Sequence, residues 1–428
     1  MSLAAYPTYD SYKDSGVEWI GDVPSEWQVE PGRQCVFENR DKNTRMKEST
    51  VLSLSYGRVI VKDEDKLTGL VPESFETYQI VQPGDIIIRG TDLQNDMTSL
   101  RTGLAKDVGI ITSAYINLRP KAQIDQVFLH YLLHSYDVKK VFYALGSGLR
   151  QNLSYLDFKY LKLPIPSPIE QRAIAAFLDG KCAGVDEAVR IKEAQIACLR
   201  ERRQILIQQA VTRGLNPAAP MKDSGIDWIG QIPAHWEVRR GKHIFREVNE
   251  RSEEGTEELL SVSHTTGVTA RSEKNVNMFL AEDYTGSKLC QPGDIVINTM
   301  WAWMGALGVS DLTGIVSPAY GVYRPMQNDD FNPHFLEWLL RTPPCIEQYN
   351  KISTGLHSSR LRLYPHMFLG MYMAHPTRDE QNAIVGHIKK EAGKIDAAIT
   401  IKQDQIAALK EYKTSLINAA VTGKIIVV

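Results

Sequence analysis

Apolar residues recur in two stretches of the chain with an alternating spacing of four and three positions. This period of 3.5 residues is typical of the contact seam of a coiled coil. It predicts two long helices, and at a rise of about 1.5 Å per residue the 185–212 stretch would extend roughly 40 Å. The seam residues are Val185, Val189, Ile196, Leu199 and Leu206 in the first stretch, and Ile395, Ile399, Ile406, Leu409 and Leu416 in the second.

Two seams in one chain most simply pair with each other, and antiparallel pairing would relate the two halves by a pseudo-two-fold axis. The alternative is that each helix packs separately on its own domain. Both seams are interrupted at the same two places by basic residues. Because an unpaired buried charge is costly, we expect these residues to reach solvent or to pair with Glu187, Glu193 or Glu411. The basic residues are Lys192, Arg203, Lys402 and Lys413.

Helix-boundary signals flank both seams. Pro168 and Asp379 stand where helix starts are expected, beside the repeated Glu-Gln-x-Ala-Ile segments at 170–174 and 380–384. Gly214 predicts the end of the first long helix. Further glycines predict a break between a short helix and each long one, at Gly180, Gly184 and Gly393.

The seams belong to a repeat that covers the whole chain. Residues 13–29 read KDSGVEWIGDVPSEWQV and residues 222–238 read KDSGIDWIGQIPAHWEV. The turn QPGDI recurs at 82–86 and 291–295, again at an offset of 209 residues. Between these matched segments the halves diverge, so a shared frame holds two unlike inserts, residues ~25–163 and ~235–373. We favour functional divergence of the inserts over simple duplication of a stable unit.

The inserts are rich in short apolar runs bounded by turn signals, which predicts mixed α/β domains with a substantial sheet. Residues ~127–145 and ~333–350 have the pattern of amphipathic helices. The fold class is therefore α+β: two α/β domains joined by two long helices that form an antiparallel coiled coil. The predicted boundaries are 1–163 and 216–373 for the insert domains, and 164–215 and 374–428 for the helical regions.

Composition narrows the functional classes. The chain has 428 residues and a formal net charge of −2, which argues against binding dominated by non-specific attraction to nucleic acid but allows local basic surfaces. The five cysteines form no metal-ligand spacing, and no stretch is long and apolar enough for a membrane span. We therefore expect no metal site, no membrane association and a cytoplasmic location.

Loops that follow matched frame segments carry polar groups suited to nucleic acid. Arg, Gln and Asn can make paired hydrogen bonds to base edges, and Lys, Ser and Thr commonly contact phosphate. A solvated side chain is the simpler interpretation of any single position, but the loops differ chemically between the copies. Trp301 and Trp303 are interpreted as packing residues. The candidate contact residues are Arg58, Arg89, Thr91, Gln94, Asn95, Arg101, Arg150 and Gln151, and then His264, Arg271, Asn298, His357, Arg360 and Arg362.

Motifs of enzyme chemistry are missing. There is no GxxxxGK[ST] phosphate loop. Glu64-Asp65-Lys66 has a nuclease-like spacing within a charge run, and Thr342-Pro343-Pro344-Cys345 departs from the amino-methyltransferase motif at both flanking residues. No His, Asp and Ser set recurs in both halves, so the chain is predicted to be non-catalytic.

These features together resemble the specificity (S, HsdS) subunits of type I restriction–modification systems. The resemblance is carried by the repeated KDSG-x-x-WIG-x-x-P-x-x-W segments, the QPGDI turns, the Pro164–Gln171 segment before the first helix, and the helix ends at 210–212 and 420–422. It covers essentially the whole chain. One departure is visible: His375–Asp379 replaces the proline-rich segment of the first copy, so the second helix start is expected to differ.

The resemblance implies that each insert is a target-recognition domain that reads one half of an asymmetric, bipartite DNA sequence. The coiled coil would set the gap between the half-sites, and its span compares with the roughly 34–36 Å between half-sites on one face of a duplex. Two modification subunits, which bind S-adenosylmethionine and methylate adenine, would dock on the shared helices. Restriction subunits, which use ATP and Mg²⁺, would join them. This chain itself would hold no cofactor.

Two other functions remain open on the sequence alone. A protein-interaction scaffold would capture partners even at high salt and after nuclease treatment, whereas DNA binding should weaken as salt rises. A cryptic methyltransferase or nuclease would bind cofactor as a purified chain.

Overall fold

The computed structural model describes residues 6–63, 74–96, 98–145, 152–273, 283–327, 330–355 and 360–427. The chain divides into two compact units, one formed by Met1–Glu193 with Lys402–Val428 and the other by Ala194–Ile401. Each unit therefore combines one insert with parts of both long helices. The predictions for Arg150, Gln151, His357 and the 64–66 segment lie outside the described residues.

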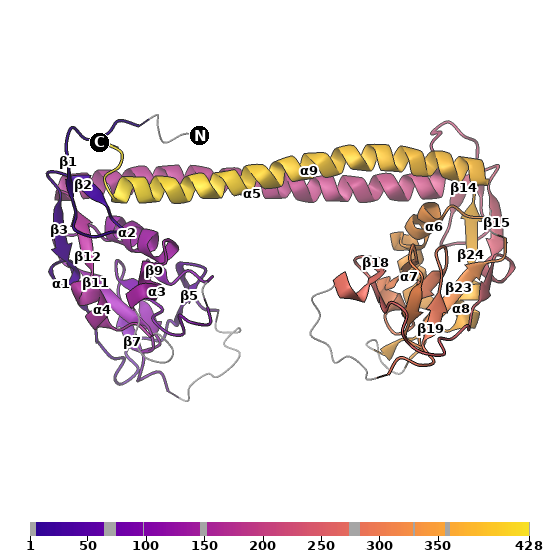
Figure 1. Ribbon diagram of the computed structural model, residues 1–428, viewed down its shortest axis with the longest axis horizontal. Coiled ribbons are helices and arrows are strands. Elements are labelled where there is room, and N and C mark those ends of the chain that lie inside the picture. Colours follow the sequence, from indigo (N-terminus) through magenta and orange to yellow (C-terminus); the bar gives the residue numbers. More distant parts are fainter. Residues whose placement is uncertain are drawn as a thin grey trace. The chain divides into compact units, whose positions relative to one another are not determined.

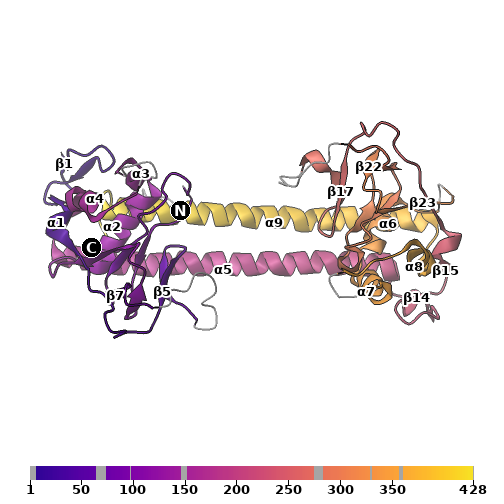
Figure 2. The same ribbon diagram turned by 90° about the horizontal axis from the view of Figure 1, so that it is seen from below.

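The two long helices, α5 (Pro168–Arg213) and α9 (Arg378–Val421), pack together in opposite directions (Figures 1 and 2). In the first unit, Lys413 Nζ lies 2.7 Å from Asp186 Oδ1, and Lys192 Nζ donates to Gln405 Oε1 at 2.6 Å. In the second unit, Arg203 pairs with Asp396 at 3.1 Å. Contacts further along α5 thus meet earlier positions of α9, which confirms antiparallel pairing.

The predicted seam is the least exposed face of both helices. All ten apolar seam residues are buried or half-buried, including Leu416, which has no exposed surface. The basic seam residues Lys192, Arg203 and Lys413 find partners on the opposite helix, but these are Gln405, Asp396 and Asp186 rather than the expected glutamates. Polar pairs that cross a seam help to fix its register.

The expected helix breaks are absent, since both α5 and α9 run without interruption through their glycines. Gly180, Gly184 and Gly393 lie on exposed faces, with open space where a side chain would begin. A glycine in a helix costs only about 1 kcal/mol. Burial of flanking residues such as Leu178 and Cys182 outweighs that cost.

The first unit is built from short antiparallel strands. Its central sheet has the order β4 (Val36–Glu38), β11 (Ile116–Pro120), β8 (Ile86–Ile88) and β9 (Thr102–Leu104). Four two-stranded pairs surround it: β1 (Tyr12–Asp14) with β2 (Asp22–Pro24), β3 (Gln28–Pro31) with β12 (Lys162–Ile165), β5 (Leu52–Ser55) with β6 (Arg58–Val61), and β7 (Gln79–Val81) with β10 (Gly109–Ile111). The helices are α1 (Gly32–Cys35), α2 (Gln126–Val138), α3 (Val141–Leu145) and α4 (Tyr155–Tyr160).

The second unit repeats this topology. Its central sheet has the order β16 (Phe245–Glu247), β23 (Gly321–Pro325), β20 (Ile295–Ile297) and β21 (Leu307–Val309). The pairs are β13 (Met221–Asp223) with β14 (Gln231–Pro233), β15 (Glu237–Arg240) with β24 (Tyr372–His375), β17 (Leu260–Ser263) with β18 (Gly267–Ala270), and β19 (Lys288–Cys290) with β22 (Gly314–Val316). Helices are α6 (Pro333–Leu340), α7 (Pro343–Ile352) and α8 (Pro365–Gly370), with 3₁₀ turns η3 (Gly241–His243), η4 (Arg271–Glu273) and η5 (Ala302–Met304). The inserts thus share strand order even where their sequences do not match.

The repeated Glu-Gln pair ties each long helix to its unit. Trp27 donates its indole N–H to Glu170 at 3.2 Å, and Trp236 donates to Glu380 at the same distance. The side-chain oxygen of Gln171 accepts from the backbone N–H that precedes α2, at 2.8 Å, and Gln381 does the same before α6. The second helix start was expected to differ, but both copies make the same contacts.

The hydrophobic core of each unit includes one end of each long helix. In the first unit Leu416 and Ile417 of α9 pack with Ile174 and Leu178 of α5 and with the apolar face of α2. The predicted 127–145 helix is two helices, since the chain turns at Lys140, whose φ is 63°. Among the described residues, no helix has the length and apolarity needed to cross a bilayer.

Candidate nucleic-acid interface

The QPGD turns fix the start of the central strands β8 and β20. Asp85 is buried, accepts the Gln82 backbone N–H at 2.9 Å and binds the Arg119 guanidinium at 2.6 and 2.8 Å. In the second unit Asp294 and Arg324 make the same two contacts at 2.7 and 2.8 Å. These ion pairs raise the pKa of both arginines through the carboxylate hydrogen bonds. The loop that follows each strand therefore begins from a backbone that is fixed by a buried ion pair.

The loops after these strands are held at the same two points in both units. The Leu153 N–H donates to the Gly90 carbonyl at 2.7 Å, and the Leu363 N–H donates to the Thr299 carbonyl at 3.0 Å. A side chain with no exposed surface also anchors each loop, Leu93 in one and Ala302 in the other. We call residues 89–101 the β8–β9 loop and residues 298–306 the β20–β21 loop. They share a scaffold but differ in length.

Arg101 holds the longer β8–β9 loop together and is not the surface residue that the sequence pattern predicted. Its side chain has no exposed area, and its Nε donates to the Tyr143 hydroxyl at 3.1 Å. Extra residues in this loop leave backbone carbonyls pointing inward, and the guanidinium satisfies them. Its acceptors are the carbonyl oxygens of Arg89, Thr91, Asp92 and Asp96.

The other candidates of the first unit lie at or near the surface. Arg58 is exposed at the start of β6. Gln94 and Asn95 follow the buried Leu93, and both are exposed. The Asn95 amide donates to Asp92 at 2.8 Å. Arg89 is half-buried and lies 3.4 Å from Asp96. Thr91 is half-buried as well. The β8–β9 loop thus presents mainly polar groups.

The β20–β21 loop presents the opposite chemistry. Asn298, a predicted contact residue, is buried and donates to the Tyr320 hydroxyl at 2.9 Å, so it supports the loop from within. Trp301, expected to be a packing residue, has 49% of its surface exposed. Its ring stacks against Trp303 with 6.0 Å between centroids. Polarity alone therefore misassigned both residues.

The remaining candidates of the second unit border this loop or the neighbouring hairpin. Arg360 is exposed, and Arg362 pairs with Thr354 through backbone hydrogen bonds of 3.1 and 2.9 Å while its side chain is exposed. His264 is exposed at the tip of the β17–β18 hairpin, and Arg271 is half-buried in η4. The structure brings Arg362 and the β20–β21 loop together through the adjoining Leu363.

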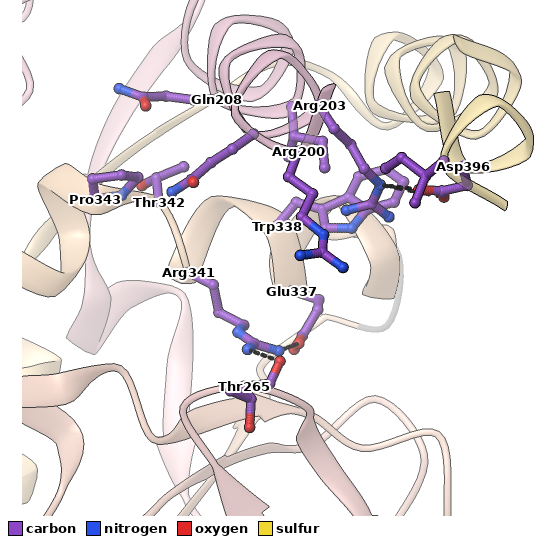
Figure 3. A pocket seen from close by; sticks show the side chains of 13 residues that line it. Arg200, Arg203, Gln208, Thr265, Glu337, Trp338, Arg341, Thr342, Pro343 and Asp396 are labelled. Carbon is purple, nitrogen blue, oxygen red and sulfur yellow. Dashed lines mark hydrogen bonds and ion pairs between the residues drawn. The ribbon is translucent and has the colours of Figure 1, made fainter. Parts of the chain in front are cut away.

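A cavity of about 630 Å³ opens in the second unit between α5, α9, α6 and the β17–β18 hairpin (Figure 3). Its two carboxylates are already paired, Glu337 with Arg341 at 2.8 Å and Asp396 with Arg203 at 3.1 Å. Arg200 points into the cavity from α5, and within the described part of the chain it makes no hydrogen bond or ion pair. The cavity therefore carries one uncompensated positive charge, which was not predicted because the sequence of α5 was interpreted as a spacer and a docking surface for partner subunits.

The region of the first unit that corresponds to this cavity carries histidines instead. Asp125 and Asn332 are the N-caps of α2 and α6, and counting from them places His134 where the second unit has Arg341. Burial and nearby Lys413 lower the pKa of His134 to about 4. Burial, His134 and Lys106 lower the pKa of His130 to about 3. The two copies thus differ in charge at this corner as well as in their loops.

No protein-family model matches the chain. It is 25% identical over 335 residues to the type I restriction enzyme MjaVIII specificity subunit of Methanocaldococcus jannaschii, a match that covers 74% of each protein. It is 23% identical over 231 residues to the putative MjaX specificity subunit of the same organism, covering 51% of this chain and 52% of that protein.

Two solved structures share the fold. One, from work on complex assembly and conformational transition of the type I R-M system, has a TM-score of 0.65 at 15% identity and covers 93% of this chain and 98% of its own. The HsdS subunit from Thermoanaerobacter tengcongensis has a TM-score of 0.51 at 15% identity and covers 94% and 98%. The fold, two α/β domains on a pair of long helices, is therefore shared with HsdS. The chain is thus similar in sequence to type I restriction enzyme specificity subunits and shares its fold with HsdS, the family that its repeated segments resemble.

Proposed function

We propose that each unit reads one half of an asymmetric, two-part DNA target, and that the chain contributes specificity without catalysis. The observation that carries this proposal is the pair of loops held by the same scaffold but opposite in chemistry. The β8–β9 loop exposes Gln94 and Asn95, whereas the β20–β21 loop exposes Trp301. Two unlike readers on one scaffold would recognise two unlike half-sites.

The paired helices α5 and α9 would set the gap between the half-sites and bind the partner subunits. Off the seam, they expose isoleucines at matched positions, Ile191 with 43% and Ile401 with 57% exposed surface. Exposed apolar side chains on a helix are suited to a protein interface. We propose that two modification subunits dock on these helices, that S-adenosylmethionine and ATP chemistry belongs to the partners, and that restriction subunits join the same assembly.

Mapping methylated adenines across a genome, with and without this subunit, tests the proposal. We expect one bipartite motif to disappear when the chain is absent. Replacing residues 92–95 should then change one half of the motif, and replacing residues 301–304 should change the other half. If the motif persists without the chain, the specificity role is refuted. If either replacement changes both halves, the loops are not separate readers.

A charge placed on the helices tests the docking role. Ile191→Asp and Ile401→Asp should weaken association with the modification subunit, measured by size-exclusion chromatography with light scattering. Glu201→Lys, also exposed on α5, is the matched control because it changes charge without removing an apolar side chain. Unchanged association of both isoleucine variants would contradict docking on this face.

A further inference from the structure

Trp301 and Met304 form an exposed apolar surface on the β20–β21 loop. Their exposed fractions are 49% and 38%. Trp301 caps the 3₁₀ turn η5 and Met304 is its last residue, while Ala302 within the turn has no exposed surface. A single exposed apolar side chain is common, but an exposed apolar patch marks a surface that meets another molecule.

The loop backbone fixes this surface in place. The Met304 and Ala306 N–H groups both donate to the Trp301 carbonyl, at 3.0 and 3.1 Å. Gly305 adopts a φ of 83°, which closes the turn, and it lies against Ile346 of α7. The indole of Trp303 donates to the Met300 carbonyl at 3.1 Å. Trp301 therefore projects from a rigid turn, not from a loose loop.

The neighbouring polar groups are already occupied. The Thr299 hydroxyl donates to the Ala319 carbonyl at 2.9 Å, and Asn298 is buried against Tyr320. The position that matches Trp301 in the first unit is Asp92, whose neighbours Gln94 and Asn95 are exposed and polar. The β20–β21 loop thus presents an apolar surface where its counterpart presents hydrogen-bonding groups.

We propose that Trp301, supported by Met304, recognises the 5-methyl group of a thymine in the half-site read by the second unit; this rests on the proposed function. In the major groove the thymine methyl is the apolar feature that distinguishes a base pair, and the apolar surface of a side chain can read it by contact. Exposed Arg362, which precedes the same scaffold contact at Leu363, offers a charge for the adjoining phosphate. Among the described residues of the β8–β9 loop, no large apolar side chain is exposed, and the exposed Gln94 and Asn95 would read the first half-site by hydrogen bonds.

The test compares thymine with deoxyuracil, which differs only by the missing methyl. The assembled complex with its modification subunit is used, on duplexes that carry the mapped target. Each thymine of each half-site is replaced singly by deoxyuracil, and the dissociation constant is measured for the wild type, Trp301→Gln and Trp301→Phe. Gln94→Ala is the matched control from the other loop.

Loss of one buried methyl should weaken wild-type binding about fourfold, at one thymine of the second half-site. Trp301→Gln should bind the thymine and deoxyuracil duplexes equally, whereas Trp301→Phe should keep part of the difference and Gln94→Ala all of it. The proposal is overturned if the second half-site contains no thymine, or if Trp301→Gln lowers affinity equally for both duplexes, as a stacking wedge would. It is also overturned if Trp301→Gln no longer associates with the modification subunit but still binds the target duplex with unchanged affinity. Failure of the proposed function is distinct, because the wild-type complex would then show no sequence preference.

Discussion

Replacing Arg101 by methionine tests whether a buried side chain keeps the β8–β9 loop in its folded conformation. Methionine retains most of the apolar stem and removes the guanidinium. The Arg89 and Thr91 carbonyls and the Tyr143 hydroxyl then lose their donor. The carbonyls of Asp92 and Asp96 lose one of two donors, since the Asp96 N–H and the Tyr143 hydroxyl remain. Burial raises the pKa of nearby Asp137. The Arg101 backbone N–H, which the variant keeps, and the guanidinium charge, which it loses, both lower that pKa.

A hydrogen bond contributes a net ~1 kcal/mol, and more when one partner is charged. Some of the carbonyls would regain water when the loop opens, so we expect a local loss of about 3–4 kcal/mol. Since about 1.4 kcal/mol corresponds to a factor of ten, opening should become roughly 100- to 1,000-fold more frequent. The global midpoint of unfolding should change much less, because the loss is confined to one loop.

Hydrogen exchange measures the opening directly. The Arg89 N–H donates to the Arg101 carbonyl, and the Leu153 N–H donates to the Gly90 carbonyl. Both hydrogen bonds hold the β8–β9 loop, so exchange of these two amides should accelerate in the variant. Arg58→Met, at an exposed position of β6, is the control and should leave both amides unchanged. In a methylation map, only one half of the motif should relax. Exchange less than about tenfold faster would show that the guanidinium does not hold the loop.

Three further predictions concern contacts within each unit. Asp294→Asn breaks a buried pair with Arg324 and should destabilise the second unit by about 3 kcal/mol in denaturant unfolding followed by tryptophan fluorescence; a loss below about 1 kcal/mol would contradict it. The folded pKa of His134 lies below its unfolded value of about 6.5, so its stabilisation is complete above that pH and is lost as pH falls toward about 4. Between about pH 7 and 5 the free energy of unfolding of the first unit should fall by about 2 kcal/mol because of His134, and by more when His130 is included. His134→Leu should flatten this dependence of stability on pH, and an unchanged slope would exclude His134 as its cause. Arg200→Ala should lower the slope of log affinity against log salt by about one without changing stability, and an unaltered slope would show that Arg200 meets no phosphate.

The long helices were predictable because their information is local and repeated. A seam such as Val185 to Leu206 specifies both the helix and its packed face, and the same pattern 210 residues later supplies the partner. The glycine breaks were wrong because glycine propensity is a weak preference. Continuous burial on the opposite face of α5, through Leu178 and Cys182, outweighs it.

The interface was predicted less well because polarity does not determine exposure. Arg101 and Asn298 are polar but buried, since each satisfies backbone or hydroxyl groups inside its loop. Trp301 is apolar but exposed, since in the short β20–β21 loop it is the neighbouring Ala302 that is buried. Loop length was the available signal: aligning the two QPGDI turns shows that residues have been added before Arg101 in the first copy.

The two units also differ in whether they are continuous in sequence. Residues 194–401 form the second unit as one continuous segment, whereas the first joins residues 1–193 to 402–428. Its core includes Leu416, Ala420 and Ile425, which are buried against residues synthesised much earlier. On the ribosome, the second unit can therefore complete its core first, and the first must wait for the last helical turns. A chain that stops before residue 402 would keep every residue of the second unit but could not complete the core of the first.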